Sequence, residues 1–374
     1  MLQRVSIQNF KSLKDVTLDL QKVNLLIGPN NSGKTNFLKA LEYYKQRCEN
    51  EYYSFEDFDR VQYKHDKQFE IILSLTALQK NGNHLNVELL LTPDVNESEA
   101  QMWESSPKSD FISKRERFDL SDNTLRERKH NRLDDRQIQF MLIRGFIGIP
   151  AIHLLDAHKL SQPNKLDPRM WIENDGSNFT SFLFNLSQNE LDSFQEIEKQ
   201  LEKYTNEFSK ILTPAVVTSE GAMLRLKLLD KQGNDYWIDE VSEGVTLFLG
   251  LLCIVYQPNP PKLLLLEEPE RGIHPRRITE VMNFIYDLAE NNDVQIILTT
   301  HNEHVLNDFA TRPEAVFVFD KNEEGATEVR NLQKDIIEPS NSRSREAGFN
   351  GIDFTSNLGD NWLYGILGGV PENL

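Results

Sequence analysis

The chain has 374 residues, which is enough for two average domains or for one large domain with an insertion. Its formal net charge of −17 (41 Lys and Arg against 58 Asp and Glu) disfavours charge-driven DNA binding by the whole surface. No apolar run approaches the ~18 residues that cross a bilayer, and the two cysteines, Cys48 and Cys253, exclude a disulfide framework or a zinc-ligand spacing. The N-terminal residues lack the apolar core of a secretory signal, so we expect a cytoplasmic protein without a membrane segment.

The first predicted elements are two short strands. Apolar residues alternate with polar ones from Val5 to Phe10 and again from Val16 to Leu20, which is typical of an antiparallel strand pair. The pair leads into Val23–Ile27, a run with four apolar residues out of five that predicts a buried strand.

A phosphate-binding loop follows that strand. Residues 28–35 read GPNNSGKT, and residues 36–45 carry apolar side chains at helical spacing. A strand, a glycine turn and a helix together aim backbone N–H groups and the positive end of the helix at a polyphosphate. The sequence therefore predicts a nucleoside triphosphate site, in which Lys34 reaches the β/γ-phosphates and the Thr35 hydroxyl binds Mg²⁺. The expected phosphate-binding residues are Gly28, Asn30, Asn31, Ser32, Gly33, Lys34, Thr35 and Asn36.

The middle of the chain changes in character. Two strand-like runs, Phe69–Leu75 and Leu85–Leu91, surround Asn81-Gly82-Asn83 and predict a hairpin. Residues 92–216 are charged and are interpreted as a mainly helical insertion, so the expected domain division is 1–91, 92–216 and 217–374.

Two features of this insertion have alternative interpretations. Thr124–Arg144 has a local charge balance of +3, which favours a solvated helix face over a contact for nucleic acid or an acidic partner. Ser187–Glu190 has the pattern of a capping box, and the helix it would begin carries a short heptad-like seam. The seam favours packing within the domain over an intermolecular coiled coil, and its residues are Phe194, Ile197, Leu201, Tyr204, Phe208 and Ile211.

Beyond residue 216 the apolar pattern returns. A long apolar helix is expected over Val245–Tyr256, with a strand at Lys262–Leu266 after it. Pro275 fits the first turn of a further helix, and a strand at Val294–Thr299 follows. Other expected strands are Met223–Leu229, Asp235–Ile238 and Ala315–Phe319.

Polar residues stand at the ends of these elements. Glu267 and Glu268 end an apolar strand and form the acid pair that an ATPase needs, one to hold the metal's water shell and one to polarise the attacking water. His301 ends the next strand, where a histidine can contact a γ-phosphate. Ser242 begins the long apolar helix and offers a second phosphate-binding helix N-terminus. Because the first helix already holds a nucleotide, Ser242 is expected to contact one held by another subunit.

Each of these motifs alone has an ordinary structural interpretation. Glu267 and Glu268 also suit the start of a helix, His301 a surface position and Ser242 an N-cap. The common order of all the motifs favours the catalytic interpretation.

This order resembles the ABC-type ATPase heads of the SMC, RecF and OLD group. In that group a phosphate loop, a long insertion, a signature serine, a Walker B strand, a D-loop and a switch histidine follow one another. Here they are GPNNSGKT, a gap of about two hundred residues, VSEGV, LLLLEEPERGIHP and TTH, and IQNFKSLKDVTLDL is similar to the first strands of these heads. The chain resembles most closely the small stand-alone ATPases of prokaryotic anti-phage and plasmid-defence operons. The implied fold is an α/β ABC-type ATPase head, with a mixed sheet, an antiparallel β subdomain and a helical insertion.

The resemblance also implies roles for single residues. ATP and Mg²⁺ would be the cofactors, with Glu268 as catalytic base and His301 as switch residue. Ser242 and Gly244 would contact the γ-phosphate in trans, and Glu267 would hold the metal together with Thr35.

Five further positions complete or disturb the resemblance. Gly272 and His274 fall in the D-loop region. Glu267 stands where these ATPases generally have Asp, which predicts slow hydrolysis. Neither Gln62 nor Gln68 is convincingly placed as the Q-loop glutamine.

The sequence is compatible with three functions. The favoured one is an ATPase that forms at least a homodimer on ATP and controls a separately encoded effector in anti-phage defence. A RecF- or SMC-like DNA-repair or chromosome-maintenance ATPase is disfavoured, because the chain is acidic and has no long heptad array. A transporter ATPase subunit is disfavoured, because such subunits place the signature much nearer the phosphate loop.

The chain is not expected to be a nuclease itself. OLD-type relatives often carry a fused Toprim domain, whose metal site needs a D-x-D acid pair. After His301 only 73 residues remain, and Asp353 and Asp360 do not form such a pair. The expected effector is therefore a separate protein of the Toprim nuclease kind. The apolar residues of the tail favour self-packing over a partner contact, and they are Phe349, Ile352, Phe354, Leu358, Trp362, Leu363 and Tyr364.

Overall fold

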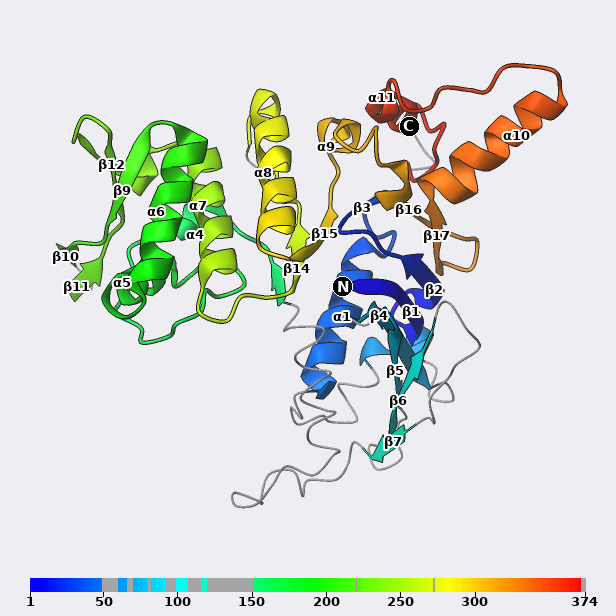
Figure 1. Ribbon diagram of the computed structural model, residues 1–374, viewed down its shortest axis with the longest axis horizontal. Coiled ribbons are helices and arrows are strands. Elements are labelled where there is room, and N and C mark those ends of the chain that lie inside the picture. Colours follow the sequence, from blue (N-terminus) through cyan, green and yellow to red (C-terminus); the bar gives the residue numbers. More distant parts are fainter. Residues whose placement is uncertain are drawn as a thin grey trace. The chain divides into compact units, whose positions relative to one another are not determined.

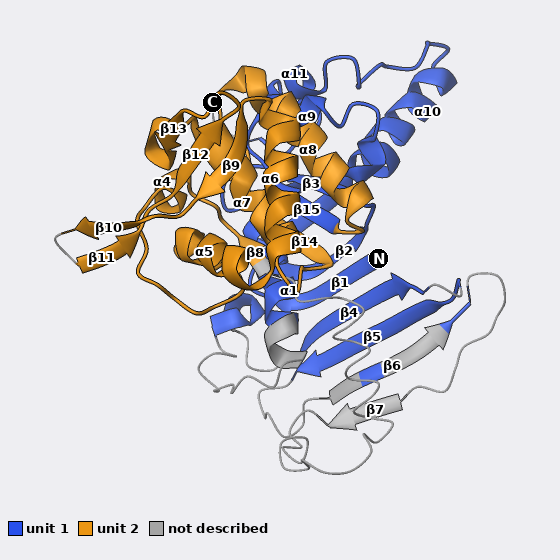
Figure 2. Ribbon diagram, turned by 60° about the vertical axis from the view of Figure 1, so that its left-hand side comes forward, with its two compact units in different colours: residues 1–150, 295–374 blue, residues 151–294 orange. Residues whose placement is uncertain are grey.

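The computed structural model describes two compact units. One unit comprises residues 1–150 and 295–374 and the other residues 151–294, as coloured in Figure 2. The predicted domain limits at residues 92 and 217 fall inside these units and stay predictions. None of the helices in the described ranges has the length and apolar character needed to cross a membrane. The described residues are 1–48, 60–65, 70–79, 82–91, 99–106, 116–119, 151–218, 221–271 and 273–370.

The first unit contains an antiparallel sheet with the strand order β2-β1-β4-β5-β6-β7 (Figure 1). The pairing of β1 with β2 and the hairpin of β4 and β5 confirm the strand pair and the hairpin predicted from the sequence. The last two strands lie in the range interpreted as mainly helical; they form because each adds to the open edge of the strand before it. The strands are β1 (Leu2–Phe10), β2 (Leu13–Asp19), β4 (Ile71–Leu78), β5 (His84–Leu91), β6 (Glu99–Ser105) and β7 (Glu116–Asp119).

The same unit contains a mixed sheet with β3 (Val23–Ile27) between two parallel neighbours. These are β15 (Gln295–Thr299) and β16 (Val316–Lys321), and β17 (Thr327–Asn331) pairs antiparallel with β16. All five residues of β3 are buried, including Asn24, whose side chain bonds to the backbone of Gln21 and to the carbonyl of Ile296.

Helix α1 (Lys34–Cys48) begins directly after the glycine-rich loop. Its aromatic side chains meet both sheets of the first unit: Tyr43 packs on Phe10 of β1, and Phe37 packs edge-on against Phe319 of β16. The C-terminal part of the unit adds α9 (Glu303–Asn307), α10 (Glu338–Glu346) and α11 (Leu358–Leu363).

The second unit is organised around α7 (Glu243–Tyr256). Every residue from Val245 to Val255 is buried, as expected for a helix that is apolar on all sides. Its Phe248 packs with Tyr204 and Phe284 of two neighbouring helices. The other elements are β8 (Ala151–His153), α4 (Ala157–Leu160), α5 (Phe179–Asn189), α6 (Leu191–Thr205), β9 (Phe208–Leu212), β10 (Ala215–Thr218), β11 (Gly221–Leu224), β12 (Lys227–Asp230), β13 (Asp235–Trp237), β14 (Leu263–Glu267) and α8 (Ile278–Asn291).

The predicted capping box at Ser187 is wrong. Ser187 lies inside α5, where its hydroxyl donates to the carbonyl of Phe184 at 2.7 Å, and Glu190 precedes α6 without a side-chain cap. The helix runs through the serine because Phe182 and Leu186 on its buried face have no exposed surface, so packing outweighs the local preference of serine.

The predicted seam is right only in part. Ile197 and Leu201 are buried on α6, but the helix ends at Thr205 because Asn206 adopts a left-handed backbone with φ 54°. Phe208 and Ile211 are buried from β9 instead of from the helix.

Candidate functional site

The loop after β3 has a backbone that only glycine permits at two places. Gly28 has φ +143°, and a Cβ there would lie 2.2 Å from the carbonyl oxygen of Phe319 on β16. Gly33 has φ +113°, and a Cβ there would lie 2.2 Å from Oγ1 of Thr327 on β17. Both glycines are therefore required, because β16 and β17 leave no room for a side chain at either position. The loop leads directly into α1.

The loop has the chemistry of a phosphate site. The Lys34 side chain is 6% exposed, and its Nζ donates to the carbonyl oxygens of Gly28 at 2.7 Å and Pro29 at 2.9 Å. The hydroxyl of Ser32 is buried and has no hydrogen-bond partner among the described residues. A buried ammonium, an unsatisfied hydroxyl and a helix N-terminus together fit a polyphosphate anion. Thr35, half-buried at the start of α1, is the residue on this loop that would hold Mg²⁺.

A second set of polar residues holds the loop in place. Thr327 Oγ1 donates to the carbonyl of Ser32 and is bonded to the Ser12 hydroxyl, both at 2.8 Å, and Asn36 Nδ2 donates to Ser12 at 2.8 Å. The sequence gives no signal for Ser12 or Thr327, because they are 315 residues apart and act through contacts with the loop.

We expect Thr327→Val to destabilise the first unit by about 1–3 kcal/mol, because it leaves the buried carbonyl of Ser32 without its donor while keeping a β-branched shape. Denaturant unfolding measures the change. Thr76→Val is the control: Thr76 also lies on a strand of this unit, but its hydroxyl bonds to the part-buried Asn86 side chain. Equal losses in the two variants would contradict a special role for Thr327.

His301 lies beside the start of the loop. Strands β15 and β3 are parallel and pair Thr299 with Leu26, so the next two residues bring His301 level with Gly28. The amide of Thr300 donates to the carbonyl of Leu26 at 3.2 Å, which continues the pairing. The exposed His301 therefore lies next to the phosphate loop.

The acid pair lies in the second unit. Glu267 is the last residue of β14, and Glu268 follows it with φ 48°, in the left-handed region. A residue before proline rarely adopts this backbone, and strain of this kind clusters at functional sites. Pro269 opens a turn in which Arg271 N–H bonds the Glu268 carbonyl at 3.0 Å, and not a helix, so the helix-start interpretation of the pair is wrong.

The signature residues lie at an open helix end in the same unit. Ser242 occupies the N-cap position of α7 and is exposed, but its hydroxyl does not cap the helix. Arg277 Nη1 lies 3.4 Å from the Ser242 hydroxyl, and a Cβ on Gly244 would meet nothing within 4 Å. A pocket of about 230 Å³ adjoins this end of the helix, lined in part by Gly244, Phe248 and Arg277. An exposed helix N-terminus with an adjacent guanidinium can receive an anion from outside the unit.

Other predicted positions have different outcomes. Gln62 is buried and bridges to Phe10 of β1, while His274 accepts the backbone N–H of Arg276 and precedes Pro275. Gly272, Gln68 and the basic stretch at 124–144 lie outside the described residues.

A lysine that sequence reasoning missed lies near the loop. Lys11 is next to Ser12 in the turn between β1 and β2, and its backbone has φ 50°. Burial, followed by the positive charge of Lys39 on α1, lowers the pKa of the Lys11 ammonium.

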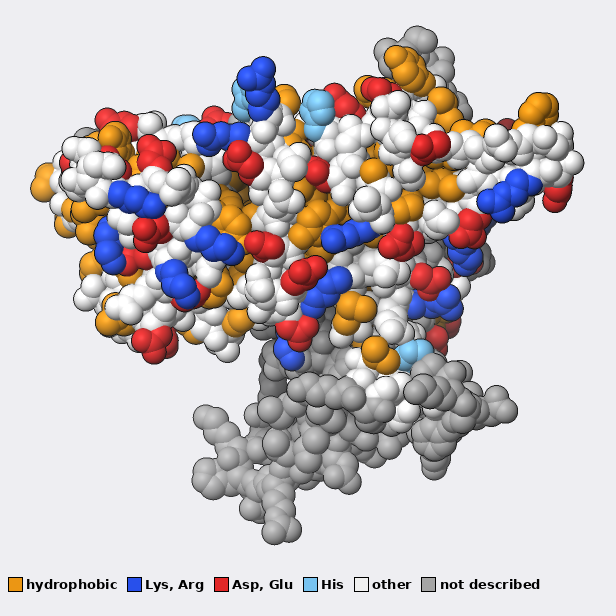
Figure 3. All heavy atoms as spheres, turned by 45° about the horizontal axis from the view of Figure 1, so that its top comes forward, with side chains coloured by type: hydrophobic (Ala, Val, Ile, Leu, Met, Phe, Trp, Pro, Cys, Tyr) orange, Lys and Arg blue, Asp and Glu red, His pale blue; other side chains and the backbone are white. Residues whose placement is uncertain are grey.

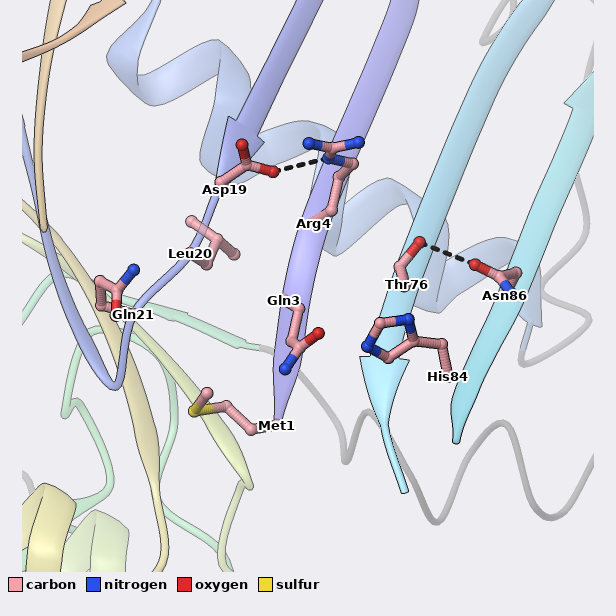
Figure 4. A pocket seen from close by; sticks show the side chains of 9 residues that line it. All are labelled: Met1, Gln3, Arg4, Asp19, Leu20, Gln21, Thr76, His84 and Asn86. Carbon is pink, nitrogen blue, oxygen red and sulfur yellow. Dashed lines mark hydrogen bonds and ion pairs between the residues drawn. The ribbon is translucent and has the colours of Figure 1, made fainter. Parts of the chain in front are cut away.

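A larger surface pocket lies at the other end of the same strands. It measures about 550 Å³ and is lined by Met1, Arg4, Asp19 and His84 among others (Figure 4). Arg4 and Asp19 form an ion pair at 2.6 Å across it, and Thr76 bonds Asn86 at 3.0 Å. Strand β1 spans roughly 27 Å at ~3.3 Å per residue, so this pocket is separate from the phosphate loop.

Comparisons with known proteins indicate the family and the fold of the chain. A family model described as "AAA domain, putative AbiEii toxin, Type IV TA system" matches residues 49–307, which is more than half of the chain. The phosphate loop precedes the matched residues. The chain is 22% identical over 334 residues to an "ATP/GTP phosphatase" of Helicobacter pylori (strain ATCC 700392 / 26695), covering 82% of this chain and 86% of that protein.

Two further likenesses are local or structural. A stretch of 42 residues is 40% identical to an "OLD nuclease" of Thermus scotoductus (strain ATCC 700910 / SA-01), covering 11% of this chain and 8% of that protein. The fold is similar to an SMC head crystallised with the C-terminal winged-helix domain of ScpA, with a TM-score of 0.55, 13% identity, and 88% of this chain and 96% of that chain covered. The chain therefore has an SMC-head-like, ABC-type α/β fold, as the motif order predicts.

Proposed function

This chain belongs to the family described as "AAA domain, putative AbiEii toxin, Type IV TA system", and on that premise we propose an ABC-type ATPase that dimerises head to tail on ATP and regulates a separately encoded effector in anti-phage defence. ATP and Mg²⁺ are its cofactors in this proposal, and the cytoplasm is its compartment. The observation that carries the ATPase is the phosphate loop, with Lys34 buried in it and His301 two residues beyond the end of the neighbouring strand β15. The Helicobacter pylori relative is named as an ATP/GTP phosphatase, which supports triphosphate hydrolysis here.

Dimerisation is proposed from the open end of α7. An exposed Ser242 that leaves its own helix uncapped, beside Arg277, suits a γ-phosphate delivered by a second copy of the chain. In this proposal Thr35 and Glu267 would hold Mg²⁺, and Glu268 would be the base that activates water.

The effector is proposed to be a different protein. The family description names a toxin–antitoxin system, which by its name has two components, and one segment is similar to an OLD nuclease. In the tail, Asp353 accepts hydrogen bonds from the hydroxyl and backbone N–H of Ser356 and then from those of Thr355, which together lower its pKa to about 2. These bonds account for Asp353 as a turn-forming residue, which supports an effector outside this chain.

DNA maintenance is the second candidate, and the likeness to an SMC head favours it. At 13% identity this likeness concerns the fold alone. On the face drawn in Figure 3, Lys and Arg side chains are interspersed with Asp and Glu over the described residues. Such a surface favours a protein partner over the phosphate backbone of DNA.

The purified chain with Mg²⁺ should hydrolyse ATP and should cut neither DNA nor RNA. Lys34→Ala should abolish the ATP turnover, because it removes the charge that faces the β/γ-phosphates. Lys14→Ala is the control, since Lys14 is exposed and paired with Glu324. Unchanged turnover in Lys34→Ala would refute the assigned site. Metal-dependent cleavage that is lost on mutating an acid other than Glu267 or Glu268 would refute the separate effector.

A further inference from the structure

The last described residues of the chain pack against the phosphate loop. Gly369 has φ +66°, and a Cβ there would lie 2.6 Å from Val318 Cγ1, 3.4 Å from Gly28 Cα and 3.5 Å from the carbonyl oxygen of Phe319. The same carbonyl oxygen excludes a Cβ at Gly28. Gly28 and Gly369 are 341 positions apart in the sequence, yet both pack against the carbonyl group of Phe319 on β16.

Side chains on three elements hold this turn. The buried indole of Trp362 on α11 donates to the Gly369 carbonyl at 3.0 Å, and Gly369 N–H donates to Asp320 Oδ2 at 3.2 Å. Arg330 of β17 donates to the carbonyl of Leu367 at 3.5 Å. Both polar groups of the Gly369 backbone are thus bonded to buried or half-buried side chains, so the position of the turn is specified by more than apolar packing.

The other end of this segment touches the helix that follows His301. Gly359 N–H donates to Asn307 Oδ1 at 2.8 Å, and a Cβ on Gly359 would lie 2.7 Å from the Glu303 carbonyl of α9. Helix α9 begins two residues after His301. The segment Leu358–Val370 therefore contacts both the first glycine of the phosphate loop and the helix that follows His301.

We propose that the segment Leu358–Val370 is a positioning clamp for the phosphate loop, in which Trp362 and Asp320 fix Gly369 against Gly28. The expected effect of the clamp on ATP binding rests on the proposed function. Its expected effect on the order of the loop does not. The clamp separates two sets of residues in the tail. Leu358 and Trp362 are buried to 5% exposure or less and build the clamp, whereas Tyr364 is 81% exposed and does not.

Two variants test the clamp. Trp362→Phe keeps the packed ring and removes the N–H that holds Gly369; Gly369→Ala adds a Cβ that has no room and a strained backbone. In the nucleotide-free protein, both should speed hydrogen exchange at the amides of residues 28–35. Both should also weaken Mg-ATP binding, by about fivefold for Trp362→Phe, the factor that one hydrogen bond is worth, and by more for Gly369→Ala.

Gly348→Ala is the matched control. Gly348 also has a positive φ, +81°, but a Cβ there would meet nothing within 4 Å. It should lower the melting temperature without changing loop exchange or the Kd for ATP. The proposal is overturned if both test variants leave the loop exchange at the wild-type rate, or if Gly348→Ala changes it equally. Faster loop exchange in a protein that binds no ATP even as wild type would uphold the clamp and refute the ATPase.

Discussion

Replacing Glu268 by Gln should leave ATP binding near the wild-type level and lower the turnover rate about 10²- to 10⁴-fold, the range that a positioned general base supplies. The substitution keeps the length of the side chain and removes only its ability to accept a proton. It also keeps the left-handed backbone at φ 48°, because both residues meet the same strain before Pro269. A loss of turnover would therefore be due to the carboxylate and not to a rearranged turn. Turnover is measured as phosphate release, and binding by calorimetry in the presence of Mg²⁺.

Glu267→Asp is the companion variant. The resemblance to ABC-type heads implies that aspartate is the usual residue at this position, so the shorter acid should keep or raise turnover. If Glu268→Gln turned over ATP at the wild-type rate while Glu267→Gln did not, the two acids would have to exchange roles. The motif order already assigns Glu267 to the metal and Glu268 to the attacking water, and the strained turn at Glu268 also favours it as the base.

The sequence predicts those parts of the molecule whose signal is local. The phosphate loop is recognisable because glycine, lysine and threonine occur at fixed spacing between a strand and a helix. The long apolar helix and the strand before Glu267 are recognisable because burial on all sides leaves a continuous apolar run. The position of His301 also follows from its place after a strand. Strands β3 and β15 are parallel neighbours, so the residues that follow them lie at the same edge of the sheet.

The sequence does not predict contacts between residues that are far apart along the chain. Ser12 and Thr327 hold the loop, and Trp362 and Gly369 fix its first glycine, yet each is an ordinary residue in its own sequence neighbourhood. The capping box at Ser187 was wrong for the opposite reason: a local pattern was present, but the buried face of α5 carried the helix through it. For the apolar residues of the tail, the sequence leaves both self-packing and a partner contact open. Part of this set is buried, as self-packing requires, whereas Phe349, Ile352, Leu363 and Tyr364 are exposed.

Ser242→Arg should leave ATP binding to the single chain intact and should block both ATP-dependent dimerisation and hydrolysis. The exposed hydroxyl lies at the open start of α7 beside Arg277, and a second long cation there would occupy the space proposed for a partner's γ-phosphate. Ser342→Arg, on the exposed side of α10, is the control and should change neither property. Light scattering with Mg-ATP, in the background that carries Glu268→Gln, measures the dimer without interference from turnover.

Mixing two inactive variants separates a site shared by two subunits from a site within one. Lys34→Ala lacks a working phosphate loop but keeps Ser242, whereas Ser242→Arg keeps the loop. In a head-to-tail dimer, one of the two sites of each mixed dimer then combines the intact loop with the intact serine. Half of the dimers in an equal mixture are mixed, so turnover should recover to about a quarter of the wild-type rate if the two sites act independently. A mixture as inactive as its components, together with no change in mass on adding ATP to the wild type, would show that Ser242 acts within its own chain. Recovery in the mixture, absent when either variant is measured alone, requires the nucleotide to lie between two copies, because no single chain in the tube then carries both residues.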